Sequence, residues 1–250
     1  MKKLKQENPN FRTADFWKPM ADYLHAQDRD IQFNLCQYGG DQPWTWAPGL
    51  GIQSWRIGGD LNHKVTTYFE QALRIATDLR DYSKPGQWND PDFMYIHKIR
   101  DFRKMTNATV EIPLDTNQRY QYVTLWSVIC APFFFSCDMD VIDEFTIRLL
   151  GNADVVGINQ DELGLVAKVE RKSDSEVVMV KPLADGSRAV ALFNRNPTNE
   201  MDVKLESAWL GGNSPSRITD AWRQKAVPKL KAGDTVRLSP NGVALLIVKK

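Results

Sequence analysis

The chain has 250 residues, of which 42% are hydrophobic, 10% aromatic and 25% charged. This composition is typical of a globular protein and argues against intrinsic disorder, collagen and coiled coil. The formal net charge of +1 gives no general attraction to nucleic acid. No apolar run approaches the roughly 20 residues of a membrane span, so we expect neither nucleic acid nor membrane as a partner.

The first part of the chain alternates between helical and strand-like patterns. A helix is expected over residues 13–27, where Thr13 can cap it and an apolar face is shared by Phe16, Met20, Tyr23 and Leu24. Strands are expected over residues 31–36 and 52–57. A long helix then follows, with an apolar stripe formed by Val65, Phe69, Ala72, Ala76 and Leu79.

The alternation continues after the Lys-Pro-Gly turn at residues 84–86. It predicts a third strand near residues 87–88, a helix over 118–129, a fourth strand over 131–136 and a last helix over 141–150. Strands and helices that alternate at this pace favour parallel β/α units. Four such strands make half of an eight-stranded barrel, which by itself typically needs about 250 residues.

The character of the sequence changes near residue 156. Apolar β-like runs at residues 176–180, 189–193 and 243–248 are separated by turn signals such as Asp-Gly and Asn-Pro. This pattern predicts an antiparallel β-sandwich of about seven or eight strands. The expected fold class is therefore α/β, with a partial barrel over residues 1–156 and a β-sandwich over 157–250.

The carboxyl ends of the predicted barrel strands are rich in chemically useful side chains. They carry Cys36, Gln37 and Tyr38, then Arg56 and Asp60, then the Asn-Asp-Pro-Asp segment that ends at Asp92. Active sites of β/α barrels collect at this edge. Carboxylates, an arginine and aromatic rings suit a sugar, and a retaining glycosidase needs two carboxylates about 5 Å apart.

Structural interpretations of the same residues remain open. Asp60 can simply cap the following helix, and the Asn-Asp-Pro segment can be only a turn. Trp44 and Trp46 can belong to a loop core instead of a sugar platform. The three histidines and three cysteines lack the spacing of metal ligands, so neither a metal nor another cofactor is expected.

Five blocks together carry a resemblance to a known family. They read LCQYG at 35–39, SWRIGGDL at 54–61, GQWNDPD at 86–92, APFFFS at 131–136 and GINQD at 157–161. In order and spacing they resemble glycoside hydrolase family 27, the family of α-galactosidases and α-N-acetylgalactosaminidases. The resemblance implies that the two parts are barrel strands 5–8 and the family's C-terminal β-sandwich, and that the substrate is a galactoside or an oligosaccharide.

The resemblance also implies roles for individual residues. Asp60 takes the position of the acid/base, Arg56 binds the sugar near its 2-hydroxyl, and Asp92 borders the glycone site. Gln37 is expected to contact the 2-position, with Cys36 and Tyr38 beside it as further substrate contacts. The bulk of Gln37 favours a 2-hydroxyl over a 2-acetamido group.

One block of the family is missing from the sequence. The family's nucleophile is an aspartate in a Lys-Tyr-Asp-like block at the end of the fourth barrel strand, and no such block occurs here. We therefore expect an N-terminally truncated α-galactosidase that is inactive by itself and self-associates through exposed barrel edges. The alternatives are an inert carbohydrate-binding or half-barrel interaction module, and an α-N-acetylgalactosaminidase or β-L-arabinopyranosidase specificity. The localisation stays open.

Overall fold

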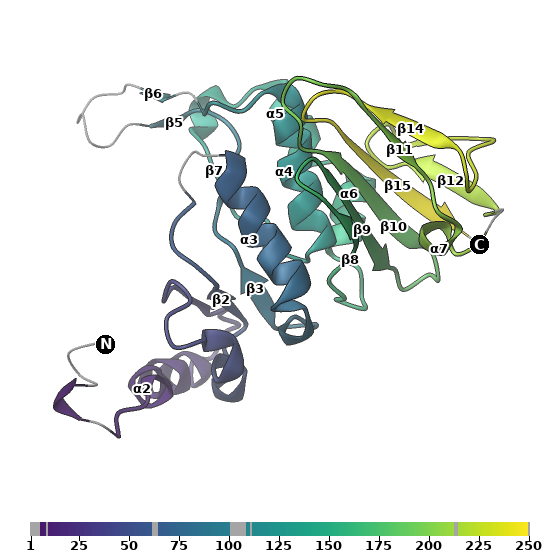
Figure 1. Cartoon of the computed structure of the whole chain (residues 1–250). Helices are drawn as coiled ribbons and strands as arrows, with labels where there is room; N and C mark the ends of the chain where they lie inside the picture. The colour runs from purple at the N-terminus through teal and green to yellow at the C-terminus, as the bar shows by residue number, and fades with distance from the viewer. Residues whose placement is uncertain are drawn as a thin grey trace.

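The first part of the chain forms short parallel strands joined by helices (Figure 1). The computed structural model describes residues 6–8, 10–61, 65–100, 109–110, 112–212 and 215–249. The elements up to residue 110 are α2 (Thr13–His25), β1 (Asn34–Leu35), η1 (Pro43–Thr45), η2 (Ala47–Leu50), β2 (Ser54–Arg56), α3 (Val65–Thr77), η3 (Arg80–Tyr82), β3 (Trp88–Asp90), β4 (Met94–Tyr95), β5 (Ile99–Arg100) and β6 (Thr109–Val110). They are followed by α4 (Thr116–Val128), β7 (Phe135–Ser136), η5 (Met139–Val141), α5 (Glu144–Leu150) and α6 (Ala153–Asn159).

The strands β1, β2 and β3 form a parallel sheet in that order, as the alternation predicts. Trp55 at its centre is fully buried and donates its indole N–H to Asn89 Oδ1 on β3 over 2.9 Å. The fourth predicted strand is β7, which pairs in parallel with β4 and not with β3. The third strand is interrupted at Pro91 and at Asp92, and Asp92 has a φ of 122°. The continuation of this strand, β4, therefore pairs with β7.

Helix α2 differs from the expectation in two ways. Its first helical residue is Thr13, whose hydroxyl donates to Asp41 Oδ2 over 2.5 Å, and among the described residues no side chain caps the helix. Three members of its predicted apolar face are also largely exposed, namely Phe16, Met20 and Tyr23. In the described part of the chain, the helix instead buries Thr13 and Ala21.

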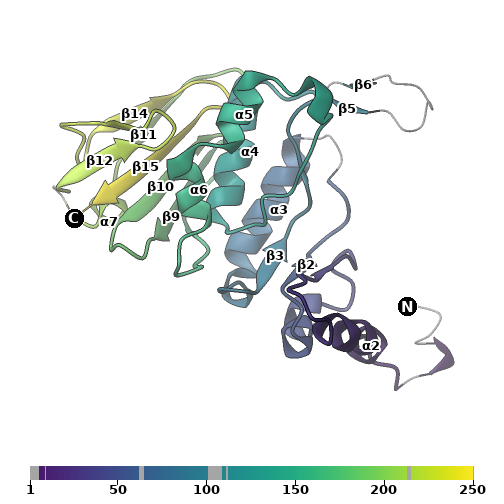
Figure 2. The same cartoon turned by 180° about the vertical axis from the view of Figure 1, so that it is seen from behind.

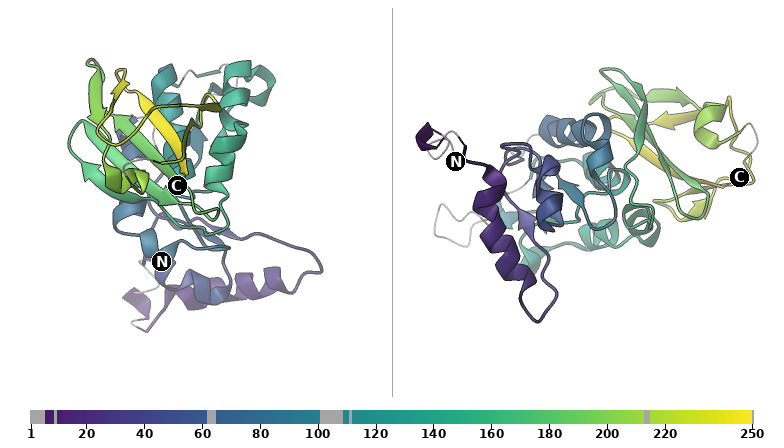
Figure 3. Two further views of the ribbon diagram at one scale, coloured as in Figure 1. Left: turned by 90° about the vertical axis from the view of Figure 1, so that its right-hand side faces the viewer. Right: turned by 90° about the horizontal axis from the view of Figure 1, so that it is seen from below.

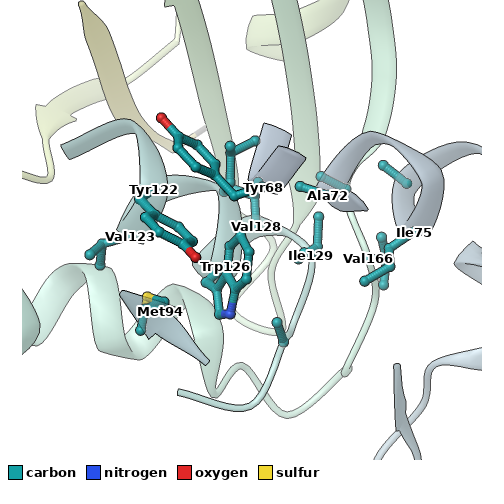
Figure 4. Packing of buried hydrophobic residues seen from close by; sticks show 14 of the residues in the cluster. Tyr68, Ala72, Ile75, Met94, Tyr122, Val123, Trp126, Val128, Ile129 and Val166 are labelled. Carbon is teal, nitrogen blue, oxygen red and sulfur yellow. The ribbon is translucent and has the colours of Figure 1, made fainter. Parts of the chain in front are cut away.

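Helices α3 and α4 fill the space between the parallel strands and the β-sandwich (Figure 1). Tyr68 of α3 and Tyr122 of α4 stack face to face, with ring centroids 4.1 Å apart. Figure 4 shows these rings beside Trp126, with Met94 of β4 in the same cluster. An aromatic pair of this kind stabilises a core by about 0.5–1.5 kcal/mol beyond the area that it buries.

The termini of these helices follow from local sequence signals. Asp115 and Gln118 form a capping box at the start of α4, two residues before the predicted start of this helix. Asp143 caps α5 by accepting the Thr146 N–H over 2.7 Å, so that the predicted helix over 141–150 starts only after this residue. The predicted apolar stripe is buried at Phe69, Ala72 and Ala76 of α3 and at Leu79, which lies just after the end of this helix. The side chain of Val65 lies outside the described part.

The second part of the chain is a β-sandwich of two antiparallel sheets, as predicted. Its elements are β8 (Lys168–Lys172), β9 (Glu176–Pro182), β10 (Arg188–Asn194), β11 (Met201–Lys204), α7 (Ser207–Leu210), β12 (Arg217–Asp220), β13 (Lys225–Ala226), β14 (Thr235–Leu238) and β15 (Val243–Lys249). The large sheet has the order β13-β12-β15-β10-β9-β8, and β11 and β14 form the small one. Figure 2 shows the sandwich on the other side of α3 and α4 from the parallel strands, and the left view of Figure 3 shows it facing the viewer.

The large sheet has a hydrophobic cluster on each face. Val178, Val190 and Leu246 point toward the small sheet, whereas Val177, Met179 and Phe193 belong to the cluster that contains the helices. Phe193 packs edge-on against Phe69 of α3, with centroids 5.4 Å apart. Alternating side chains of one strand thus serve two cores, which joins the half-barrel to the sandwich.

The predicted division at residue 156 falls within helix α6. We propose that the chain has two domains and that helix α6 connects them. In the part of the chain that the structure describes, no helix is both long and apolar enough to cross a membrane.

Candidate active site

The candidate site lies at the carboxyl ends of β1, β2 and β3, and its centre is Arg56. This last residue of β2 is only 5% exposed. Its Nη1 lies 2.9 Å from Asp92 Oδ1, and its Nη2 lies 3.1 Å from Asp60 Oδ1. One guanidinium therefore bridges two carboxylates that follow different strands, in the fork geometry that distinguishes arginine from lysine.

The surroundings of Arg56 act on its charge in opposite directions. Burial works to lower the pKa of the guanidinium, but the charge of Asp92 and the hydrogen bond to Asp60 outweigh it and raise this pKa. The Arg56 Nε is buried and has no hydrogen-bond partner among the described residues. An unpaired donor costs about 1–3 kcal/mol when it is buried.

Asp60 is the accessible carboxylate of the pair. Its side chain is 61% exposed, whereas that of Asp92 is 2% exposed. The Asp60 carboxylate is held on one side by Arg56 and faces solvent otherwise. It is therefore accessible to a molecule that lies on this rim.

Asp92 is held on both of its oxygens. Oδ1 pairs with Arg56, and Oδ2 accepts the Leu61 N–H over 2.7 Å. Burial raises the pKa of this carboxyl group, and the hydrogen bonds from backbone N–H groups and the charge of Arg56 oppose that rise. The positive φ of Asp92 costs about 1–3 kcal/mol for a non-glycine residue, and these contacts hold the residue in that conformation.

A supporting layer beneath the site was missed at the level of sequence. Asp90 Oδ1 accepts the Asp92 N–H over 2.8 Å, and Asp90 Oδ2 accepts the Asn34 side-chain amide over 2.8 Å. The same Asn34 amide also donates to Ser54 Oγ over 2.9 Å. Three neighbouring strands are therefore locked together directly below Asp92, and burial raises the pKa of Asp90. The alternation of strand residues is the only signal that could have identified Asn34.

The segment after β1 lies against the end of β2. Gly39 donates its N–H to Arg56 O over 3.0 Å and has a φ of +72°. A Cβ at this position would lie 2.1 Å from Ile57 O, so only glycine allows the close approach. The Arg56 Nη1 then lies 3.9 Å from Cys36 Sγ, and its Cζ lies 5.6 Å from the Tyr38 ring.

Not all aromatic candidates face the site. Tyr38 is 57% exposed on the rim and can offer its ring to a sugar. Trp44, in contrast, is buried against Arg74, and the indole N–H of Trp46 is taken by Asp41 O, so both belong to the loop core. Gln37 is engaged as well, because its Oε1 accepts the Trp17 indole N–H over 2.5 Å.

Tyr95 is a further side chain near the site that sequence reasoning missed. It alternates with the buried Met94 and Ile96 and is itself half-buried. Burial is the main reason why the pKa of its phenol is raised, and the charges of Asp92 and Asp60 raise this pKa further. Its alternation with two buried apolar residues was the available signal. The described residues contain no cluster of three or more His, Cys, Asp or Glu side chains that could hold a metal ion.

The fold and the site define a class of protein. A half-barrel with an arginine–carboxylate cluster at the carboxyl ends of its strands, followed by a β-sandwich, is the framework of a glycoside-cleaving hydrolase. The family model "Alpha galactosidase A" matches residues 52–161, and that of the "Alpha galactosidase C-terminal beta sandwich domain" matches residues 173–248. The chain belongs to glycoside hydrolase family 27, the α-galactosidase family.

Individual relatives agree with this assignment. Alpha-galactosidase 2 of Arabidopsis thaliana is 29% identical over 94% of this chain and 56% of its own length. The α-galactosidase of Cyamopsis tetragonoloba is 30% identical over 76% of this chain and 43% of its own. The chain thus spans about half the length of the curated relatives that it matches.

Solved structures share the fold. A Bacteroides fragilis protein, provisionally named an α-galactosidase/melibiase, is 29% identical with a TM-score of 0.83, over 94% of this chain and 51% of its own. A β-L-arabinopyranosidase of the same family from Geobacillus stearothermophilus, in complex with arabinose, has a TM-score of 0.82 at 19% identity. That match covers 97% of this chain and 56% of the other, and it supports the fold alone.

Proposed function

We propose that this chain carries the acid/base side of an α-galactosidase active site. The observation that carries the proposal is the bridge from the buried Arg56 to the exposed Asp60 and the buried Asp92. A galactosyl hydroxyl can accept a hydrogen bond from such a guanidinium. The names of the relatives support an α-galactoside as the substrate.

Each acidic residue has a separate role in this proposal. Asp60 is exposed, and in this proposal it protonates the leaving oxygen and then deprotonates water in a double displacement. Asp92 does not serve as the nucleophile, because one oxygen pairs with Arg56, the other accepts the Leu61 N–H, and the side chain is buried. Its role is to orient Arg56 beneath the sugar.

The chain by itself is then expected to bind galactose without cleaving galactosides at an appreciable rate. A retaining enzyme needs a second accessible carboxylate about 5 Å from the acid/base, and Asp92 does not supply it.

Calorimetry with galactose and a hydrolysis assay with 4-nitrophenyl α-galactoside test the two statements separately. We expect calorimetry to detect galactose binding, and we expect Arg56→Lys to lower the affinity for galactose at least tenfold. We expect hydrolysis of the aryl galactoside to stay at the background rate. Asp174→Asn is the matched control for an exposed carboxylate, because this residue lies in the turn between β8 and β9. Absence of galactose binding would refute the site, and hydrolysis that disappears in Asp60→Asn would refute the claim of inactivity.

The sugar itself is the second question. The fold similarity to a β-L-arabinopyranosidase leaves an arabinoside as a second candidate. The hydrogen bond from the Trp17 indole N–H to Gln37 Oε1 holds the Gln37 side chain in place beside the rim. We expect galactose to compete better than N-acetylgalactosamine, because the ordered amide occupies volume that an acetamido group needs. Competition among galactose, N-acetylgalactosamine and arabinose decides between these substrates.

A further inference from the structure

The end of helix α4 carries a buried cysteine that the proposed active site does not use. Cys130 is 4% exposed and lies in the left-handed region with a φ of 55°. Its Sγ lies 3.1 Å from Lys181 Nζ, and its thiol donates to Leu165 O over 3.3 Å. Thiol and amine are thus in van der Waals contact without an intervening atom.

Lys181 on β9 is fully buried, which is rare for a lysine. Its Nζ donates to Ile158 O near the end of α6 and to the sulfur of Cys130. These two contacts fix the position of the nitrogen, so the reacting pair is already oriented. The two residues are 51 positions apart and belong to different parts of the fold.

A cavity also borders Cys130. Cys130 lines a cavity of about 410 Å³ whose other walls include Trp88, Phe133 and Asn159. A hydroperoxide is small enough to enter such a space. Burial raises the pKa of the Cys130 thiol, and Lys181 works in the opposite direction.

We propose that Cys130 and Lys181 form an oxidative sulfur–nitrogen cross-link when the protein meets hydrogen peroxide. Peroxide first transfers an oxygen atom to the sulfur, which gives a sulfenic acid and one water. The Lys181 nitrogen, as the free amine, then attacks the sulfur through its lone pair, the S–N bond forms, the S–O bond breaks, and hydroxide leaves with an amine proton as a second water. The sulfur loses two electrons, and the peroxide is reduced to two waters.

The cross-link would join the end of α4 in the half-barrel to β9 in the sandwich. A link across 51 positions removes chain entropy from the unfolded state, so the oxidised protein should unfold at a higher temperature. Thiol reagents should reverse it, because a thiolate can attack the sulfur of the link.

Mass spectrometry tests the proposal in a Cys36→Ser/Cys137→Ser variant, where Cys130 is the remaining cysteine. Treatment with hydrogen peroxide should lower the intact mass by about 2 Da and join the peptides that contain Cys130 and Lys181. Dithiothreitol should restore both the mass and the lower unfolding temperature. The same protein treated in concentrated urea should not form the link, because the contact exists only in the folded chain.

Lys181→Met in the same background provides the matched variant, since it keeps the length of the side chain and removes the amine. It should acquire oxygen at Cys130 and no cross-link. If this variant does not fold, the peptide map of the lysine-containing protein still decides. A Cys130 that stays a thiol, or that gains oxygen without joining Lys181 in the folded protein, would overturn the proposal.

Discussion

Arg56 and Asp92 form a buried ion pair with 2.9 Å between Nη1 and Oδ1, and both side chains are less than a tenth exposed. Removing one partner of such a pair leaves an uncompensated charge in the core. Asp92→Asn should therefore lower the free energy of unfolding by about 3–5 kcal/mol, measured by urea denaturation. Asp15→Asn, which breaks the exposed pair with Arg12, should lower the free energy of unfolding far less, because solvent screens an exposed ion pair. Equal losses in the two variants would show that the buried pair does not matter to the fold.

The buried carboxyl group of Asp90 makes a prediction about pH. Burial raises its pKa above 3.8 in the folded state. Between pH 3.8 and this raised pKa, the folded state therefore binds more protons than the unfolded state. Its contribution to stability is present below pH 3.8 and is lost as the pH rises through the folded pKa. The stability of wild type relative to Asp90→Asn should therefore fall as the pH is raised from about 3.5 toward 7.

Asp185 supplies a control of opposite sign. Hydrogen bonds from Ser187, and then the contact with Lys249, lower its pKa from 3.8 to about 2. Its contribution to stability is present above pH 3.8 and is lost as the pH falls toward 2. The stability of wild type relative to Asp185→Asn should therefore fall in acid. Urea titrations at several pH values measure both differences. The same slope for Asp90 and Asp185 would contradict the assignment.

Gly39 tests the contact between the ends of β1 and β2. An alanine there combines a positive φ with a Cβ only 2.1 Å from Ile57 O. Gly186→Ala is the control, since its φ is +80° and its Cβ would meet no atom within 4 Å. The left-handed conformation alone costs about 1–2 kcal/mol, so Gly186→Ala should lose that amount and Gly39→Ala clearly more. Only Gly39→Ala should also weaken galactose binding, because it moves the segment that contacts Arg56.

We predict that the chain self-associates through apolar side chains near the half-barrel edge. Phe135 on β7 is 41% exposed, and Phe93 beside β4 is 47% exposed. Exposed strand edges with apolar side chains favour pairing between molecules. Phe135→Lys should shift sedimentation velocity profiles toward the monomer, whereas Ile147→Lys on α5, which removes a similarly exposed side chain, should not. A wild-type protein that stays monomeric at high concentration would contradict the expectation.

The sequence predicted those features that depend on local patterns. The alternating β/α segments, the antiparallel runs after residue 156 and the helix expected over residues 118–129 all rest on residues a few positions apart. The same is true of Arg56 and Asp60, which lie four residues apart and form an ion pair. The apolar face of α2 shows the limit of such reasoning, because periodicity indicates which residues share a face but not what covers it.

What the sequence determined by itself was the family and the strand ends that carry Asp60, Arg56 and Asp92. Only the tertiary structure decided that Asn34 and Asp90 lock the strands beneath the site, that β7 pairs with β4, and that Lys181 meets Cys130. These contacts join positions 41 to 56 residues apart, and their existence depends on how whole elements pack. A motif can name the residues of a site, whereas packing decides which of them are buried, paired or free to react.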